Sequence, residues 1–165
     1  MLEQLVGLAE LIGAAGVILS LLYVGRQLKQ TNAMSRSAAR QALSSQFNGW
    51  AMGIATSPDL AQSLAKVSFD GLVRNTASDL ERIQIGYAYA AIVEQVHMAW
   101  QHEKDGILTE KETNELYQPS GALFDRPYML SLWDVIRDNY ADDFCIWFER
   151  KYGVPTVEQG VEQPQ

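Results

Sequence analysis

Glu94 and His97 are the residues of this chain whose types and spacing best fit a chemical site. On a helix, positions i and i+3 share a face, so a carboxylate and an imidazole would point the same way. A di-iron bundle uses a Glu-x-x-His pair on each of two helices plus two further glutamates. The chain has one such pair, and His102-Glu103 is not spaced to replace the second. We therefore expect no metal and no cofactor, with a histidine bonded to a neighbour, and keep a metal-binding bundle using Glu94 and His97 as an alternative.

The single cysteine, Cys145, lies in an aromatic run that is typical of a protein core. Reactive thiols occupy exposed, electropositive places, whereas Cys145 is followed by Ile146, Trp147 and Phe148. No G-x-S-x-G, glycine-rich phosphate loop or H-E-x-x-H is present. We therefore predict no catalytic residues and a non-enzymatic protein. We assign the tryptophans and other aromatic residues at helical spacing to the core. The alternative is that some of them form an exposed binding patch.

The stretch from Leu5 to Gly25 organises the rest of the chain. It holds 21 residues and one charge, Glu10, and as a helix it would reach about 30 Å, the thickness of a bilayer's hydrocarbon core. The stretch does not resemble a cleaved signal peptide, because the one charged residue before it is acidic and no A-x-A cleavage site follows it. A buried core helix stays an alternative, since the uninterrupted apolar run covers only Leu11 to Gly25. The prediction is one transmembrane helix.

Small residues follow one face of this predicted span. They are spaced 4, 3 and 4 and lead to an aromatic residue, the set being Ala9, Gly13, Gly16, Ser20 and Tyr23. Small residues let helices approach closely in lipid, so we expect a helix–helix interface here, in self-association or with a membrane-protein partner. The simpler alternative is that glycine and alanine are common in membrane helices.

Glu10 is the one ionisable residue inside the span. An intramembrane carboxylate usually faces protein or water. It could line the lumen of a pore as a proton or ion site, or it could form a hydrogen bond between protomers. It could also lie high enough in the span to reach the headgroups. We favour a structural role over an ion site.

Charge sets the predicted orientation. No acidic residue lies between Glu10 and Asp59, and the basic residues that follow the span are Arg26, Lys29, Arg36 and Arg40. Basic flanks stay cytoplasmic and contact lipid headgroups, so the N-terminus should lie outside. Residues 59–165 carry 18 acidic and 9 basic side chains, which argues against nucleic acid as a partner. A lone cysteine suits a reducing cytoplasm.

The remaining chain predicts helices throughout, and so an all-α fold. We expect a transmembrane anchor over 1–30, a helical rod over 31–56 that continues it, a cytoplasmic helical bundle over 57–153 and an acidic tail over 154–165. A bend at Thr31-Asn32 is the alternative to a continuous rod. Caps and breakers place the helices of the bundle at 58–69, 79–104, 110–116, 127–139 and 142–152, with a loop over 118–121.

The helix at 79–104 carries two apolar stripes. One contains Leu80, Ile83, Tyr87 and Ala90, and the other contains Ile85, Tyr89, Ile92 and Val96. Two stripes indicate a helix covered on most of its circumference, which makes it the expected centre of the bundle.

Two motifs give the chain a family resemblance. The apolar helix ends in Tyr23-Val24-x-x-Gln27-Leu28-Lys29-Gln30, and Ser57-Pro58-Asp59-Leu60-Ala61 starts a later helix. Over most of residues 11–150 the chain resembles a widespread family of small, uncharacterised bacterial membrane proteins. The resemblance implies a bacterial inner-membrane protein and carries over no activity. We thus expect an interaction or scaffold subunit, either a homo-oligomer or an accessory subunit of a membrane complex.

Overall fold

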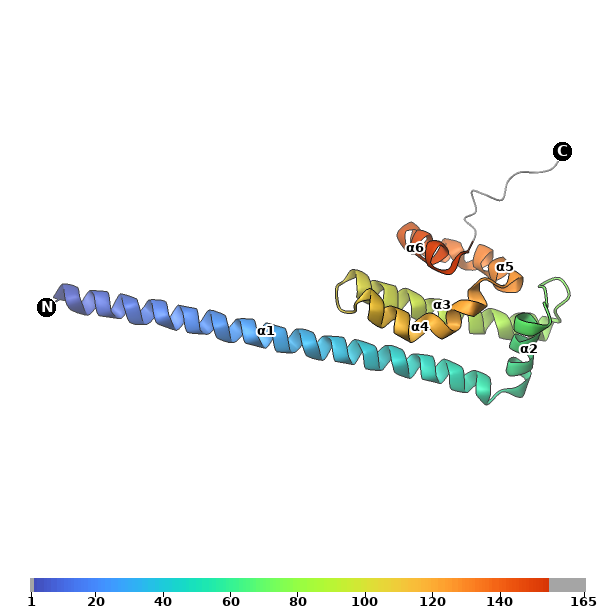
Figure 1. Ribbon diagram of the computed structural model, residues 1–165, viewed down its shortest axis with the longest axis horizontal. Helices are drawn as coiled ribbons and strands as arrows, with labels where there is room; N and C mark the ends of the chain where they lie inside the picture. The colour runs from blue at the N-terminus through green and yellow to red at the C-terminus, as the bar shows by residue number, and fades with distance from the viewer. Residues whose placement is uncertain (1, 155–165) are drawn as a thin grey trace, which may run out of the picture. The chain divides into compact units, whose positions relative to one another are not determined.

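The computed structural model describes the backbone of residues 2–154, and the side chains of residues 7, 13–117 and 123–154. Within these residues it contains helices and no strand, which confirms the all-α prediction. The elements are α1 (Leu2–Ala55), α2 (Pro58–Phe69), α3 (Asp79–Lys104), α4 (Glu110–Phe124), α5 (Pro127–Ile136), a 3-10 turn η1 (Arg137–Asn139) and α6 (Asp142–Tyr152) (Figure 1). The predicted acidic tail from residue 155 lies outside the described residues.

The chain divides into two compact units, residues 1–39 and residues 40 onward. The first unit consists of the N-terminal part of α1. The second contains the rest of α1 and all later helices, so residues 40–55, which we assigned to the rod, belong to the compact bundle.

Side-chain caps explain where the helices of the bundle begin. Ser78 Oγ accepts the Glu81 N–H at 3.3 Å, and a Glu81 carboxylate oxygen accepts the Ser78 N–H at 2.8 Å. Thr109 and Glu112 form the same capping box at the start of α4. These reciprocal bonds satisfy backbone donors that have no partner inside the helix. The predicted first residues 58, 79, 110, 127 and 142 are all confirmed.

α4 is longer than the sequence predicts. It runs through Pro119 to Phe124, where we expected it to end near residue 116 with a loop over 118–121. Tyr117 and Phe124 are both fully buried, with 1% and 0% of their surface exposed. Packing of these two rings on opposite sides of the proline keeps the segment helical, so the predicted loop is wrong.

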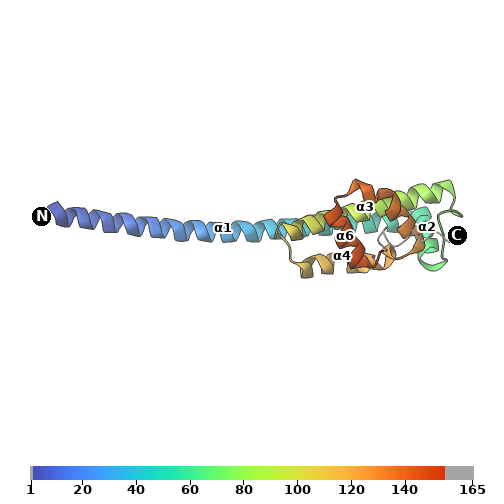
Figure 2. The ribbon, with the colours of Figure 1, turned by 90° about the horizontal axis from the view of Figure 1, so that it is seen from above.

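α3 lies at the centre of the second unit and contacts α2, α4 and α5 (Figure 2). Its buried face carries the second predicted stripe, Ile85, Tyr89, Ile92 and Val96, each at most 2% exposed. Aromatic rings from the later helices complete the core. Trp133 stacks on Phe148 at 4.4 Å between ring centroids, and Phe124 meets Phe148 edge-on at 5.0 Å.

The other stripe of α3 does not lie in the core. Leu80, Ile83 and Tyr87 are 59%, 58% and 77% exposed. The prediction that this first stripe is covered is therefore wrong within the described residues. The ion pair Lys66–Glu81 and the bond from Ser63 to Gln84 hold α2 beside the buried stripe instead.

The C-terminal part of α1 packs within the bundle. Leu43 is 2% exposed, the Phe47 ring meets Tyr117 edge-on at 6.1 Å, and Trp50 Nε1 donates to the Ala88 carbonyl at 3.0 Å. These three contacts explain why the second unit begins near residue 40.

Candidate functional site

The N-terminal part of α1 presents an uncovered apolar surface. Between Val17 and Val24, six large aliphatic side chains are 48% to 67% exposed, namely Val17, Ile18, Leu19, Leu21, Leu22 and Val24. A Cβ added at Gly13 or Gly16 would meet nothing within 4 Å. Exposed apolar surface of this extent marks an interaction surface. The predicted interface residues Gly13, Gly16, Ser20 and Tyr23 share one side of this helix.

The polar side chains on this surface bond within the helix. Ser20 Oγ donates to the Gly16 carbonyl at 2.8 Å, and Gln27 Nε2 donates to Tyr23 Oη at 2.9 Å. A hydroxyl that bonds back to the fourth carbonyl before it does not need water as a partner. The side chains of Ala9 and Glu10 lie outside those that the structure describes, so the predictions made for them stay predictions.

Four basic residues follow this surface, and all are exposed, namely Arg26, Lys29, Arg36 and Arg40. Arg40 also pairs with α4, its guanidinium lying 3.2 Å from Glu112 and 3.8 Å from Glu115. Arg40 was predicted to contact lipid headgroups with the other three, and the structure gives it an intramolecular role in the bundle. Among the described residues, no helix is long and apolar enough to cross a membrane.

Glu94 and His97 do come together, but as part of an aromatic cluster. His97 Nδ1 lies 3.9 Å from Glu94 Oε1, and Tyr140 Oη donates to Glu94 Oε2 at 3.4 Å. The His97 ring is packed between Trp100, Tyr140 and Phe144, with centroids 4.6 to 5.9 Å away. Burial, and then the nearby Glu94 carboxylate, raise the pKa of Tyr140 to about 12, so its hydroxyl stays protonated and donates.

This cluster lacks the ligands of a metal site. No group of three histidine, cysteine, aspartate or glutamate side chains that could hold a metal ion occurs within the part of the chain that the structure describes. The sequence missed Tyr140 as the partner of Glu94, because the two residues are 46 positions apart. The only available signal was the position of Tyr140 just before a helix rich in aromatic residues.

Cys145 lies in the core as expected. It is fully buried, and its thiol faces the Arg137 and Tyr140 carbonyls at 3.5 and 3.9 Å. Burial raises the pKa of the Cys145 thiol, with Arg137 opposing the shift. A buried, protonated thiol is a poor nucleophile.

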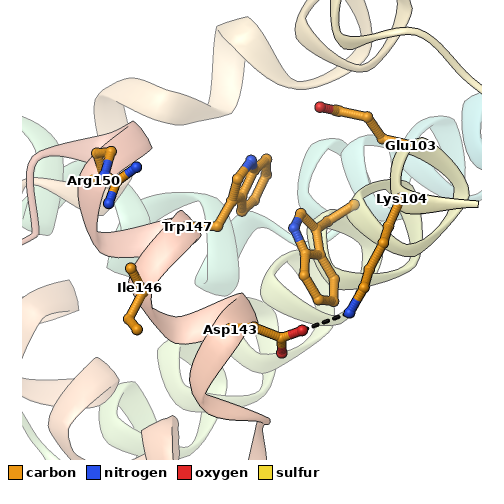
Figure 3. Close-up of a pocket in the computed structure, with 7 residues that line it drawn as sticks. Glu103, Lys104, Asp143, Ile146, Trp147 and Arg150 are labelled. Carbon is orange, nitrogen blue, oxygen red and sulfur yellow. Dashed lines mark hydrogen bonds and ion pairs between the residues drawn. The ribbon is translucent and has the colours of Figure 1, made fainter.

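A shallow groove lies between the end of α3 and α6 (Figure 3). Its volume is about 430 Å³, and its walls include Trp100, Trp147 and Ile146. Lys104 spans the two helices, bonding Asp143 at 2.5 Å while its ammonium lies 4.8 Å from the centre of the Trp100 ring. Figure 3 shows Arg150 and Lys104 on either side of Trp147. The groove offers apolar contact and charge but no activated nucleophile.

Comparisons with protein families, curated proteins and solved structures found no match to this chain. Within the described residues the fold is all-helical, and the chain divides into two compact units.

Proposed function

We propose that this chain is a non-enzymatic, membrane-anchored interaction or scaffold subunit that self-associates through the N-terminal part of α1. The observation that carries the proposal is the uncovered face of α1, where exposed aliphatic side chains surround small residues. In lipid such a face is stable, and small residues allow a second helix to pack closely.

The one described hydroxyl at the centre of the proposed span is compatible with an apolar environment. Ser20 bonds to a carbonyl of its own helix, which is how polar side chains are satisfied where water is excluded. The proposed span, Leu5 to Gly25, begins among residues whose side chains lie outside the described ones. Arg26, Lys29 and Arg36 follow it directly and would meet the headgroups on the cytoplasmic side of a bacterial inner membrane, with the N-terminus outside.

The first test compares the mass of the full chain in nanodiscs for three proteins. These are the wild type, Gly13→Leu/Gly16→Leu, and the matched control Ala14→Leu/Gly25→Leu, which adds two leucines to the opposite side of the helix. An added Cβ at Gly25 also meets nothing within 4 Å, so neither pair is disfavoured by sterics within the chain. We expect a defined oligomer for the wild type and for the control, and a monomer for Gly13→Leu/Gly16→Leu.

Two results would count against the proposal. Equal oligomers in all three proteins would place the assembly elsewhere on the chain. Recovery of the full chain in the soluble fraction of cells, with none in washed membranes, would rule out the proposed membrane anchor.

A further inference from the structure

The side of α1 that carries the predicted interface continues past the end of the proposed span. Successive residues of an α-helix turn by about 100°, so positions three and four apart share a side. At this spacing Tyr23 is followed by Gln27, Thr31, Met34 and Ala38, and α1 is helical throughout. The residues of this side lie within about 40° of one line along the helix. We call them the α1 face, which comprises Gly13, Gly16, Ser20, Tyr23, Gln27, Thr31, Met34 and Ala38.

Within the part of the chain that the structure describes, the α1 face has no cover after Gly25. Met34 is 58% exposed, and Gln27, Thr31 and Ala38 are exposed as well. Small, apolar and uncharged side chains gathered on one side form the pattern of a helix that packs against another helix.

The charged residues of this part of α1 all lie away from the α1 face. Positions 11–39 carry only Arg26, Lys29 and Arg36, with no acidic residue. Arg26 lies about 100° from the line of the face, and Lys29 and Arg36 lie about 160° and about 180° from it. Anionic headgroups would therefore be drawn to the other side of the helix.

This distribution of charge fits a second copy of the same helix as the partner. Copies that cross a membrane in the same direction pack parallel, so each residue of the face meets its own counterpart around a twofold axis. A basic residue on the face would then oppose a like charge, which destabilises a helix pair. The face carries none from Gly13 to Ala38.

We propose that the α1 helices of two copies stay paired along the α1 face for about 20 Å beyond Gly25, in a parallel contact that extends to Ala38. The inference rests on the proposed function, because insertion in one direction makes the pair parallel. Gln27 Nε2 donates to Tyr23 Oη at 2.9 Å, so this polar pair enters the contact with a hydrogen bond already made. An uncharged polar residue in one layer of a helix pair fixes its register.

Single cysteines in the full chain, oxidised in membranes with copper phenanthroline, test the pairing. Met34→Cys and Ala38→Cys should each give a disulfide-linked dimer, because the two copies of either residue face each other. Asn32→Cys is the matched control, since it lies two positions from Met34 but about 140° from the line of the face. Ser20→Cys reports the contact inside the span. The wild type, with only the buried Cys145, gives the background.

The outcomes separate this inference from the proposed function. Linking of Ser20→Cys, with Met34→Cys and Ala38→Cys no higher than Asn32→Cys, would show that the helices part on leaving the membrane. That result would overturn the longer contact and leave the assembly inside the span intact. No link at any position, Ser20→Cys included, would count against both. Equal linking of Met34→Cys and Asn32→Cys would show random collision and overturn the inference.

A charge substitution tests the contact by a second route. Met34→Arg added to Ala38→Cys places two like charges opposite each other, and the linked fraction should fall roughly fivefold or more. Asn32→Arg adds the same charge on the side that already carries Lys29 and Arg36, and should leave the linked fraction within about twofold. An unchanged linked fraction with Met34→Arg would contradict a paired helix at this position.

Discussion

Glu149 shows how a single residue ties two helices of the bundle together. Its side chain is 3% exposed, and one oxygen accepts from Arg137 Nε at 2.8 Å and from Trp133 Nε1 at 3.1 Å. Both bonds go to the same oxygen, Oε1, and the other carboxylate oxygen, Oε2, is buried without a hydrogen-bond partner among the described residues. The Glu149 carboxylate also holds the pKa of Arg137 above its usual range.

Removal of the Glu149 carboxylate should destabilise the bundle strongly. Glu149→Ala leaves the Arg137 guanidinium and the Trp133 N–H without their acceptor, and we expect a loss of about 3 kcal/mol in the free energy of unfolding. Glu149→Gln keeps one acceptor oxygen and should lose less. The control is Glu115→Ala, at an exposed position, with an effect within about 0.5 kcal/mol. Urea unfolding of the full chain measures all three, and equal midpoints would contradict this role.

The ionised Glu81 carboxylate should make the free energy of unfolding depend on pH in the acidic range. Its bond to Lys66 at 2.6 Å, together with the Ser78 capping bonds, lowers the pKa of its carboxyl from 4.5 to about 2. The unfolded chain therefore takes up this proton before the folded chain does as pH falls. The contribution of Glu81 is fully present above about pH 5 and is lost between there and pH 2.

The measurement is the slope of unfolding free energy against pH in that window. Glu81→Gln should flatten it, while Asp59→Asn, in the first turn of α2, serves as the control of equal charge change. An unchanged slope in Glu81→Gln would show that other carboxyls account for the acid dependence.

At the scale of one helix, two isoleucines of α3 should differ in how much stability is lost when each is replaced by alanine. Ile85 is 0% exposed and Ile83 is 58% exposed, two positions apart on the same helix. Ile85→Ala should cost about 2–4 kcal/mol of stability through lost burial and a cavity, whereas Ile83→Ala should stay within about 0.5 kcal/mol. Thermal unfolding of the two variants at low protein concentration checks the difference. Equal losses would mean that α3 is covered on both sides within one chain.

The sequence predicts elements better than contacts, and α3 and α4 show why. The first residues of the bundle helices were predictable because Ser78 with Glu81, Thr109 with Glu112, and the prolines act within a few positions. The end of α4 was not, because burial of Phe124 against distant helices overrides Pro119. Periodicity shows that Leu80 and Ile83 share a stripe, but it does not show whether another helix of the chain covers that stripe.

The candidate sites follow the same division. The small-residue face of α1 is visible in the sequence because its spacing is local. The surroundings of His97 are not, since Tyr140 and Phe144 arrive from residues more than 40 positions away. The sequence left a metal pair only as an alternative, and the fold surrounds His97 with aromatic rings.

At the scale of the whole molecule, the division at residue 40 determines which fragment folds. Residues 40–55 contribute Leu43, Phe47, Trp50 and the Arg40 ion pair to the second unit. Loss of the buried Leu43 side chain costs about 2–4 kcal/mol, and loss of the half-buried Phe47 and Trp50 side chains adds to it. The total stability of a small domain is about 5–15 kcal/mol. Removing the segment should therefore exhaust most of that stability.

Two truncations test this boundary. The chain from Arg40 onward should unfold cooperatively, with near-UV circular dichroism like that of the same residues in the full chain. The chain from Ser57 onward should keep helical far-UV signal but lose the sharp transition, because the Tyr117 ring and the Ala88 carbonyl lose the partners that α1 supplies. A cooperative transition in both fragments at the same temperature would assign residues 40–55 to an independent rod. A transition in the longer fragment alone would make the last four turns of α1 part of the bundle core.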